Sequence, residues 1–246
     1  MRIRALSGVT GPVVFTAAWV AGSLRQTGHG PLSVQLSGLA APDARDPRIM
    51  ITGFLVLGGC TVWLGQELAG DVGGVGPRLM QGAGVLTAAA GLLRRDHMEL
   101  TSGPASWHND AHDVVSLVLY ADLVVAQLLL ARRFGAMPSW RGWRRYLLGS
   151  GIATAAALAV FLPNTGSASA GLLQRIAVTI PLAATTAVAV RLASRPVPGP
   201  RNLTSDIGRE KHVFEGDLPG LSSRFAPYVA SRVSASEMRR WRYQEK

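Results

Sequence analysis

The stretch YLLGSGIATAAALAVFL, residues 146–162, contains no charged residue, and it decides the fold class of the chain. Six apolar segments occur, each near the roughly 20 residues that a helix needs to cross the hydrocarbon core of a bilayer. They are too many and too uniformly apolar for amphipathic helices in a water-soluble core. The sequence therefore predicts an all-α fold, a polytopic bundle of six transmembrane helices. The segments span residues 8–24, 49–66, 76–93, 113–131, 144–162 and 171–192.

Two of these segments are rich in Gly, Ala, Ser and Thr, namely residues 77–93 (PRLMQGAGVLTAAAGLL) and the stretch quoted above. Small residues let membrane helices approach closely. We interpret Gly82, Gly84 and Gly91 as part of a helix-packing face rather than as a ligand site.

The composition excludes several classes of protein. Of the 246 residues, 48% are hydrophobic and 16% are charged, whereas soluble domains carry about a quarter charged residues. The single cysteine, Cys60, permits neither a disulfide within the chain nor a cysteine-based metal site. The net charge of +10 comes from residues at the ends of apolar segments and near the C-terminus. They form no basic stripe on a folded domain, so we expect no nucleic-acid partner.

Arginine in the short loops predicts the orientation, because basic residues favour the cytoplasmic side. With the N-terminus inside, the inner segments before the tail hold eight arginines and the outer loops five. We expect both termini to be cytoplasmic and the protein to lie in the cell membrane. Trp140 and Trp143, in the loop before the fifth segment, are typical of an interfacial belt. The first segment follows MRIR and resembles a signal peptide, but the five further helices favour a retained first helix.

The loop RRDHMELTSGPASWHNDAHD, residues 94–113, gathers three of the five histidines and four of the fifteen acidic residues. The predicted orientation places it on the outer face with the loop of residues 25–48. These two loops hold four of the five histidines and six of the nine acidic residues that precede residue 193. Either the loops are polar because they are solvated, or they form a functional site.

His108 and His112 are four residues apart, so both rings share one face if the helix begins near Ser106. Together with Asp113 and a water they could hold Zn²⁺. The alternative is a hydrogen-bonded His/Asp network. We expect the network and no bound cofactor. Asn109 and Asp110 are candidates for capping this helix.

Two ionisable residues lie inside apolar segments. Asp122 falls near the middle of the fourth segment, where a charged group is costly and faces the bundle interior. It indicates either a proton or substrate path or a buried packing residue. Arg175 lies near the outer end of the last segment. We expect it to pair with an outer carboxylate such as Asp96 or Asp113, or to extend toward the interface.

Four motifs occur in a fixed order: HGPLSVQLSGLA (29–40), an Asp-containing segment after the third helix, SWHNDAH (106–112) and GLLQRIAV (171–178). In this the chain resembles the bacterial membrane family labelled domain of unknown function 998. The resemblance covers about residues 8–192 and implies six helices, a membrane location and no established activity. No cysteine stands beside Asp96, where some members have one. The matching positions are Ser33, Ser37, Asp96, His108, His112, Gly171 and Arg175.

Residues 193–246 differ from the six-helix domain of residues 1–192. The Pro-rich stretch RPVPGPRNLTSD (195–206) predicts a linker, and the tail is expected to be largely disordered and cytoplasmic. Its end, YVASRVSASEMRRWRYQEK (228–246), could instead form a basic helix on anionic lipid of the inner leaflet.

Three classes of function remain open. A small transporter would use Asp122 and Arg175 to line a polar path. The sequence lacks the inverted repeats and broken helices typical of such a site, and Pro181 is one candidate for a break. A membrane enzyme acting on lipid or envelope material would use Asp96, His108 and His112 as acid–base groups. No sequence motif for a nucleophile is present. We therefore expect a binding, sensory or structural membrane protein.

Overall fold

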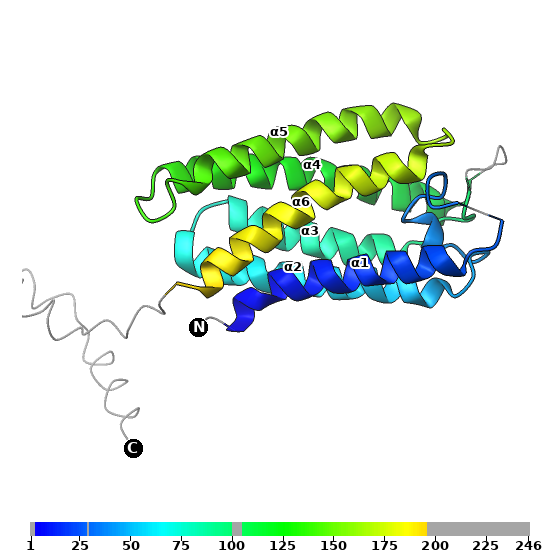
Figure 1. The fold of residues 1–246 in the computed structure, drawn as a ribbon, viewed down its shortest axis with the longest axis horizontal. Coiled ribbons are helices and arrows are strands. Elements are labelled where there is room, and N and C mark those ends of the chain that lie inside the picture. Colours follow the sequence, from blue (N-terminus) through cyan, green and yellow to red (C-terminus); the bar gives the residue numbers. More distant parts are fainter. Residues whose placement is uncertain (1–2, 29, 100–104, 196–246) are drawn as a thin grey trace, which may run out of the picture. The chain divides into compact units, whose positions relative to one another are not determined.

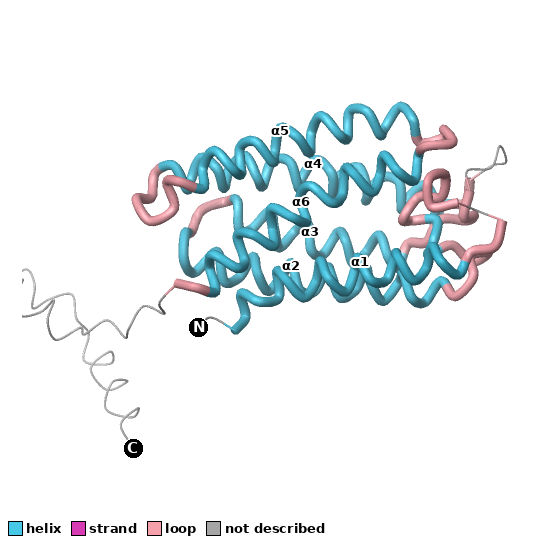
Figure 2. The backbone as a smooth tube through the Cα atoms, viewed as in Figure 1, coloured by secondary structure: helices cyan, strands magenta, loops and turns pink. Residues whose placement is uncertain are grey.

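The computed structural model of the chain describes residues 3–28, 30–99 and 105–195. Over these residues the chain is helical and has no strand (Figure 2), so the predicted all-α fold with six helices is confirmed. The α-helices are α1 (Ser7–Arg25), α2 (Pro47–Val72), α3 (Gly76–Leu92), α4 (Trp107–Gly135), α5 (Trp143–Phe161) and α6 (Ala170–Ala193) (Figure 1).

Five of these helices are long and apolar enough to cross a membrane, judged by length and composition. The exception is α3, which has 17 residues and packs between α2 and α4. Pro181 lies inside α6 without ending it, so the helix is continuous at this candidate break.

Helix α4 begins at Trp107, well before the apolar segment predicted from residue 113. The side chain of Ser106 starts it by accepting a hydrogen bond from the backbone N–H of Asn109 at 3.4 Å. A serine at this position satisfies a helix N–H that would otherwise lack a partner. The cap is therefore Ser106, not Asn109 or Asp110 as the sequence indicated.

The six helices form a closed ring. Each packs against its neighbours in the sequence, and α6 returns to pack against α1. Consecutive helices run in opposite directions, so the loops gather at two ends (Figure 1). We call the end with loops 26–46, 93–106 and 162–169 the loop-one end, and the other the opposite end.

We call the contact between two neighbouring helices of the ring a seam. Neighbouring helices approach closely where glycines of the two helices face each other. A Cβ on Gly58 of α2 would lie 2.5 Å from the carbonyl oxygen of Gly84 in α3, and a Cβ on Gly84 would lie 2.6 Å from that of Gly58. These distances are too short for any side chain. The prediction of a packing face is borne out at Gly84 and at Gly91, which lies against Phe54.

Loop one, residues 26–46, folds into the end of the ring instead of covering it from outside. Its residues 34–41 are all buried, and Leu36 and Leu39 are 2% and 1% exposed. A Cβ on Gly38 would lie 2.3 Å from the carbonyl oxygen of Met98. Loop one thus packs directly against the segment that follows α3.

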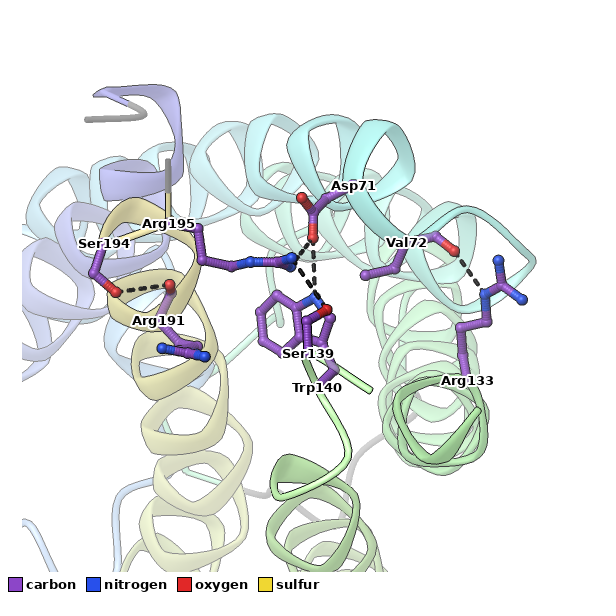
Figure 3. A network of polar contacts seen from close by, with 8 residues as sticks. All are labelled: Asp71, Val72, Arg133, Ser139, Trp140, Arg191, Ser194 and Arg195. Atoms are coloured by element: carbon purple, nitrogen blue, oxygen red, sulfur yellow. Dashed lines mark hydrogen bonds and ion pairs between the residues drawn. The ribbon is translucent and has the colours of Figure 1, made fainter. Parts of the chain in front are cut away.

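The opposite end is closed by polar contacts around Asp71 at the end of α2 (Figure 3). Its carboxylate accepts a hydrogen bond from Trp140 Nε1 at 2.9 Å and forms an ion pair with Arg195, whose other nitrogen donates to Ser139. Trp140 is fully buried and stacks on Phe134 at 4.3 Å. Its predicted place in an interfacial belt is therefore wrong, because its indole N–H has a buried carboxylate as partner.

Gly58→Ala should lower the stability of the ring by about 1–3 kcal/mol, because the methyl group would force α2 and α3 apart. Gly59→Ala is the matched control, since nothing lies within 4 Å of a Cβ there. It should be neutral or add up to about 1 kcal/mol from helix propensity. Thermal unfolding of the purified protein in detergent measures both variants, and equal behaviour would contradict the close seam.

Candidate functional site

Two adjoining cavities mark the loop-one end as the candidate site. The first, the polar cavity, has a volume of about 270 Å³ and lies between loop one, the segment after α3, and helices α4, α5 and α6. Nine of its twelve lining residues have polar side chains. These are Gln35, Ser37, Arg95, His112, Asp113, Ser116, Tyr120, Thr165 and Gln174.

The second, the apolar cavity, is slender, with a volume of about 90 Å³, and all six helices line it. Its wall on α4 runs from His112 to Leu130, which at 1.5 Å per residue is about 27 Å along the helix axis. This length approaches the thickness of a bilayer core, about 30 Å. The residues that line both cavities are Ser37, His112, Ser116, Tyr120 and Gln174.

Arg95 supplies a buried cation in the wall of the polar cavity. Its side chain is 6% exposed, and Nη1 donates to Gln35 Oε1 at 3.0 Å. Gln35 is itself fixed by donating to the carbonyl oxygen of Thr165 at 2.7 Å. Arg95 Nε is buried without an acceptor, and among the described residues no carboxylate forms an ion pair with this guanidinium. The guanidinium therefore has no direct ionic partner, although the carboxylate of Asp113 lines the same cavity.

His112 lies where the two cavities meet and is 3% exposed. Its Nδ1 lies 3.0 Å from the carbonyl oxygen of Ala90 and 2.6 Å from that of Leu93. Carbonyl oxygens only accept, so in the neutral ring Nδ1 has the proton and Nε2 is an acceptor. Nε2 is 3.3 Å from Ser116 Oγ, which therefore donates to the ring. The Nδ1 proton of His112 also satisfies the carbonyls of Ala90 and Leu93 at the end of α3, which have no partner within the helix.

Gln174 and Tyr120 continue this polar wall. Gln174 accepts a hydrogen bond from the backbone N–H of Leu36 at 2.5 Å and donates Nε2 to the hydroxyl oxygen of Tyr120 at 3.0 Å. Gln174 thus joins loop one to α4 through α6.

Arg175 holds loop one in place. Its Nη1 donates to the carbonyl oxygens of Pro31 at 2.6 Å and Val34 at 2.7 Å, and Nη2 donates to Ser23 Oγ at 3.0 Å. The guanidinium also lies 5.2 Å from the ring centre of Trp19. Among the described residues it pairs with carbonyls and not with Asp96 or Asp113, so the predicted ion pair is wrong.

Gly171 and Arg175, four residues apart in the motif GLLQRIAV (171–178), act on the same part of loop one. A Cβ on Gly171 would lie 2.3 Å from the carbonyl oxygen of Val34 and 2.7 Å from that of Pro31. Without a side chain at Gly171, these carbonyls reach both the N-terminus of α6 and the guanidinium one turn further on. Ser33 contributes its carbonyl oxygen, which accepts from the N–H of Gly171 at 3.1 Å.

Asp96 lies outside the polar cavity. Its carboxylate accepts from the hydroxyl of Ser106 at 2.5 Å and from the backbone N–H of Ser106 at 2.7 Å. These two hydrogen bonds hold the pKa of Asp96 below its usual range. Asp96 thus fixes the start of α4 as an ionised carboxylate.

The other predicted residues divide between the cavity wall and other positions. Ser37 and Asp113 line the polar cavity with His112. His108 is exposed and stacks on Trp107 at 3.6 Å. Asp122 is half-buried, lies 3.3 Å from a Cβ placed on Gly82 of α3, and lines neither cavity.

Within residues 3–28, 30–99 and 105–195, no three His, Cys, Asp or Glu side chains gather as metal ligands. The proposed helix on anionic lipid falls outside these residues, as do Arg232, Arg239, Arg240, Arg242 and Trp241.

Arg95, Gln35 and Gln174 complete the wall, and the sequence alone did not identify them as site residues. Gln174 stands beside Arg175 in an apolar segment, and a polar residue there was a usable signal. Arg95 has only the signal of a basic residue near a helix end, which membrane topology explains equally well.

Comparison with known proteins gives one match. The family described as "Protein of unknown function (DUF998)" matches residues 9–191, in agreement with the resemblance found in the sequence motifs. No curated protein and no solved structure matches.

Arg175→Gln should loosen loop one. The carbonyls of Pro31 and Val34 would lose their donor, and each buried acceptor without a partner costs about 1–3 kcal/mol. Hydrogen–deuterium exchange should then rise across residues 30–41 and stay unchanged in α2. Arg78→Gln, an exposed arginine at the opposite end, is the control and should leave the exchange of loop one unaltered. Unchanged exchange in the Arg175 variant would contradict this role.

Proposed function

The chain belongs to the DUF998 family of proteins of unknown function, and we propose that it is a multi-pass membrane protein that binds an anionic, single-chain membrane amphiphile inside its helix ring. One observation carries this proposal. A polar cavity with a buried arginine adjoins a slender apolar cavity, and five residues line both. The polar cavity suits a head group, and an alkyl chain would enter the narrower apolar cavity by displacing the side chains that line it.

The charge of Arg95 supports an anionic head group. A buried charge without a counter-charge is costly, and removing such a cation from water is repaid only by close partners. Gln35 supplies one neutral acceptor to Nη1. A carboxylate or phosphate would supply the direct ionic partner that Asp113, elsewhere in the same wall, does not. The planar guanidinium suits both groups.

The polar cavity must supply most of the affinity. An alkyl chain that leaves the bilayer for the apolar cavity exchanges one apolar surrounding for another, so the hydrophobic effect contributes little. Packing in the slender cavity selects for a single chain. The head group at Arg95 then determines how tightly the amphiphile binds.

A transport path has less support. Asp122 and Arg175 line neither cavity. Of the polar residues deeper in the apolar cavity, Thr61 and Thr87 donate within their own helices, to Leu57 and Ala83. Gln127 is occupied by Leu123 of its own helix and by Ser150 and Thr154 of α5. Such side chains do not offer a continuous polar route.

The orientation belongs to the same proposal. We place the protein in the cell membrane with both termini cytoplasmic, so that the polar cavity faces outward. The arginine count supports this sidedness, because five arginines cluster between residues 132 and 145 at the opposite end.

Arg95→Gln should weaken the binding of dodecyl phosphate by about 10–100-fold, because a charge-assisted hydrogen bond is worth about 1.5–3 kcal/mol and 1.4 kcal/mol is tenfold in affinity. Binding to the protein in zwitterionic nanodiscs can be measured by native mass spectrometry. Neutral dodecanol should bind weakly and be insensitive to this substitution. Equal binding of both compounds to wild type would contradict the role of Arg95.

Ala126→Leu should reduce binding of the same compound by filling the apolar cavity, which Ala126 lines at 2% exposure. Ala121→Leu is the matched control on the same helix, because Ala121 is exposed on the outer surface of the ring. Loss of binding in both variants, or in neither, would show that the chain does not occupy this cavity.

Ala168→Cys and Ala136→Cys test the orientation, since both positions are exposed and lie at the loop-one end and the opposite end. A membrane-impermeant maleimide added to intact cells should label the first and not the second. Wild type, with its half-buried Cys60, gives the background. The reverse pattern would place the polar cavity in the cytoplasm.

A further inference from the structure

We propose that Ser116 and His112 form a nucleophile–base pair that cleaves a carboxylic ester of an amphiphile bound in the two cavities. This inference rests on the proposed function and adds a reaction to it. It starts from one contact, the 3.3 Å separation between Ser116 Oγ and His112 Nε2, which is close to the range of a working nucleophile and base.

The fixed orientation of the histidine ring is the first support. The carbonyl oxygens of Ala90 and Leu93 hold the Nδ1 proton, so the lone pair of Nε2 faces the serine hydroxyl. A base needs a third group that fixes its tautomer and direction. Here two backbone carbonyls at the end of α3 do so, instead of a carboxylate.

The location of the pair is the second support. Ser116 and His112 line both cavities, so they stand at the boundary between the polar and the apolar space. In an ester amphiphile the carbonyl carbon lies at the same boundary, between the alkyl chain and the head group. A chain in the apolar cavity would therefore bring its ester carbonyl to Ser116.

Tyr120 provides a donor for the developing oxyanion. It follows Ser116 by one helical turn and lines the same two cavities. Its hydroxyl oxygen accepts from Gln174 Nε2 at 3.0 Å, and among the described residues its own proton forms no hydrogen bond. That proton is free to be donated into the cavity, and donors placed in advance at a low-dielectric site strongly stabilise an oxyanion.

The reaction needs only water as co-reactant. Ser116 Oγ forms a bond to the carbonyl carbon while its proton moves to His112 Nε2. The carbon–oxygen bond to the alcohol part then breaks, and His112 returns the proton to the leaving alkoxide. A water from the polar cavity attacks the acyl-serine, gives its proton to His112, and releases the acid as Ser116 recovers its hydrogen. The sum is ester plus water to acid plus alcohol.

A purely structural role for the same contact makes a different prediction. His112 would then only satisfy the carbonyls at the end of α3, and Ser116 would be as unreactive as any other serine. Ser150 provides that comparison, because it is half-buried in α5 and donates to Gln127 Oε1 at 2.6 Å. Among the described residues it forms no hydrogen bond with a histidine.

The test is covalent labelling of the full chain in nanodiscs by dodecyl fluorophosphonate, located by peptide mass spectrometry. Ser116 should be labelled, with Oγ displacing fluoride from phosphorus. Ser116→Ala should lose the adduct, and Ser150→Ala should be labelled like wild type. His112→Gln should slow labelling by about 100-fold or more, the usual contribution of a general base. Hydrolysis of p-nitrophenyl dodecanoate should follow the same order.

Dodecyl phosphate binding separates this inference from the proposed function. Ser116→Ala should still bind it, because the serine does not hold the head group, and this binding also shows that the variant is folded. If wild type binds dodecyl phosphate but Ser116 gains no adduct, or if another serine is labelled instead, the nucleophile–base pair is wrong and the proposed function stands. If wild type neither binds nor reacts, both are wrong.

Discussion

The site depends on the hydrogen bonds that the buried guanidinium of Arg175 donates to the backbone carbonyls of loop one. Loop one lies inside the ring. Over its described residues, 26–28 and 30–46, only the short 3-10 turn of Gly38–Ala40 is regular secondary structure that satisfies backbone polar groups. Buried carbonyls need donors, and Arg175 supplies two of them while Gln174 accepts from the N–H of Leu36. Two consecutive residues of α6 therefore place Gln35, Leu36 and Ser37 at the cavity walls. Gly171 is part of the same device, because only its missing side chain lets the loop come close enough.

The ring itself explains why an internal cavity exists. When each helix packs on its neighbours in sequence and the last closes on the first, no helix fills the centre. Glycines such as Gly58 and Gly84 draw neighbouring helices together at the seams, but they supply no volume toward the middle. The central space is then filled only by inward side chains, and it stays open where these are small, as at Ala83 and Ala126. Close seams and an unfilled centre thus follow from the same small-residue composition.

Much of the fold follows from the sequence, and much less of the site. Uninterrupted apolar segments give six helices because a bilayer-length apolar run has few alternatives. Helix ends depend on polar residues, which explains why α4 starts at its Ser106 cap instead of at the apolar run. The partners of Arg175 were not predictable, because backbone carbonyls leave no trace in residue identities. In the sequence, Arg95 contributed only to the count of basic residues that predicts the orientation. Its burial depends on how loop one folds over it, and the sequence does not reveal that fold. The spacing of His108 and His112 predicted that both rings lie on one face of the helix. Only His112 is buried, because it packs against the end of α3, and the sequence does not show that contact.

His112 also shows why a structural and a chemical role need not compete. The two carbonyls at the end of α3 have no partner within the helix, and buried carbonyls need donors. A histidine that satisfies them through Nδ1 is left with an acceptor at Nε2, because a neutral imidazole has one donor and one acceptor. The helical spacing of four residues then brings Ser116 to that acceptor. The requirement to close the end of α3 thus already produces an oriented base beside a hydroxyl. Arg95, in the same cavity wall, adds the charge that would hold an anionic ligand beside them.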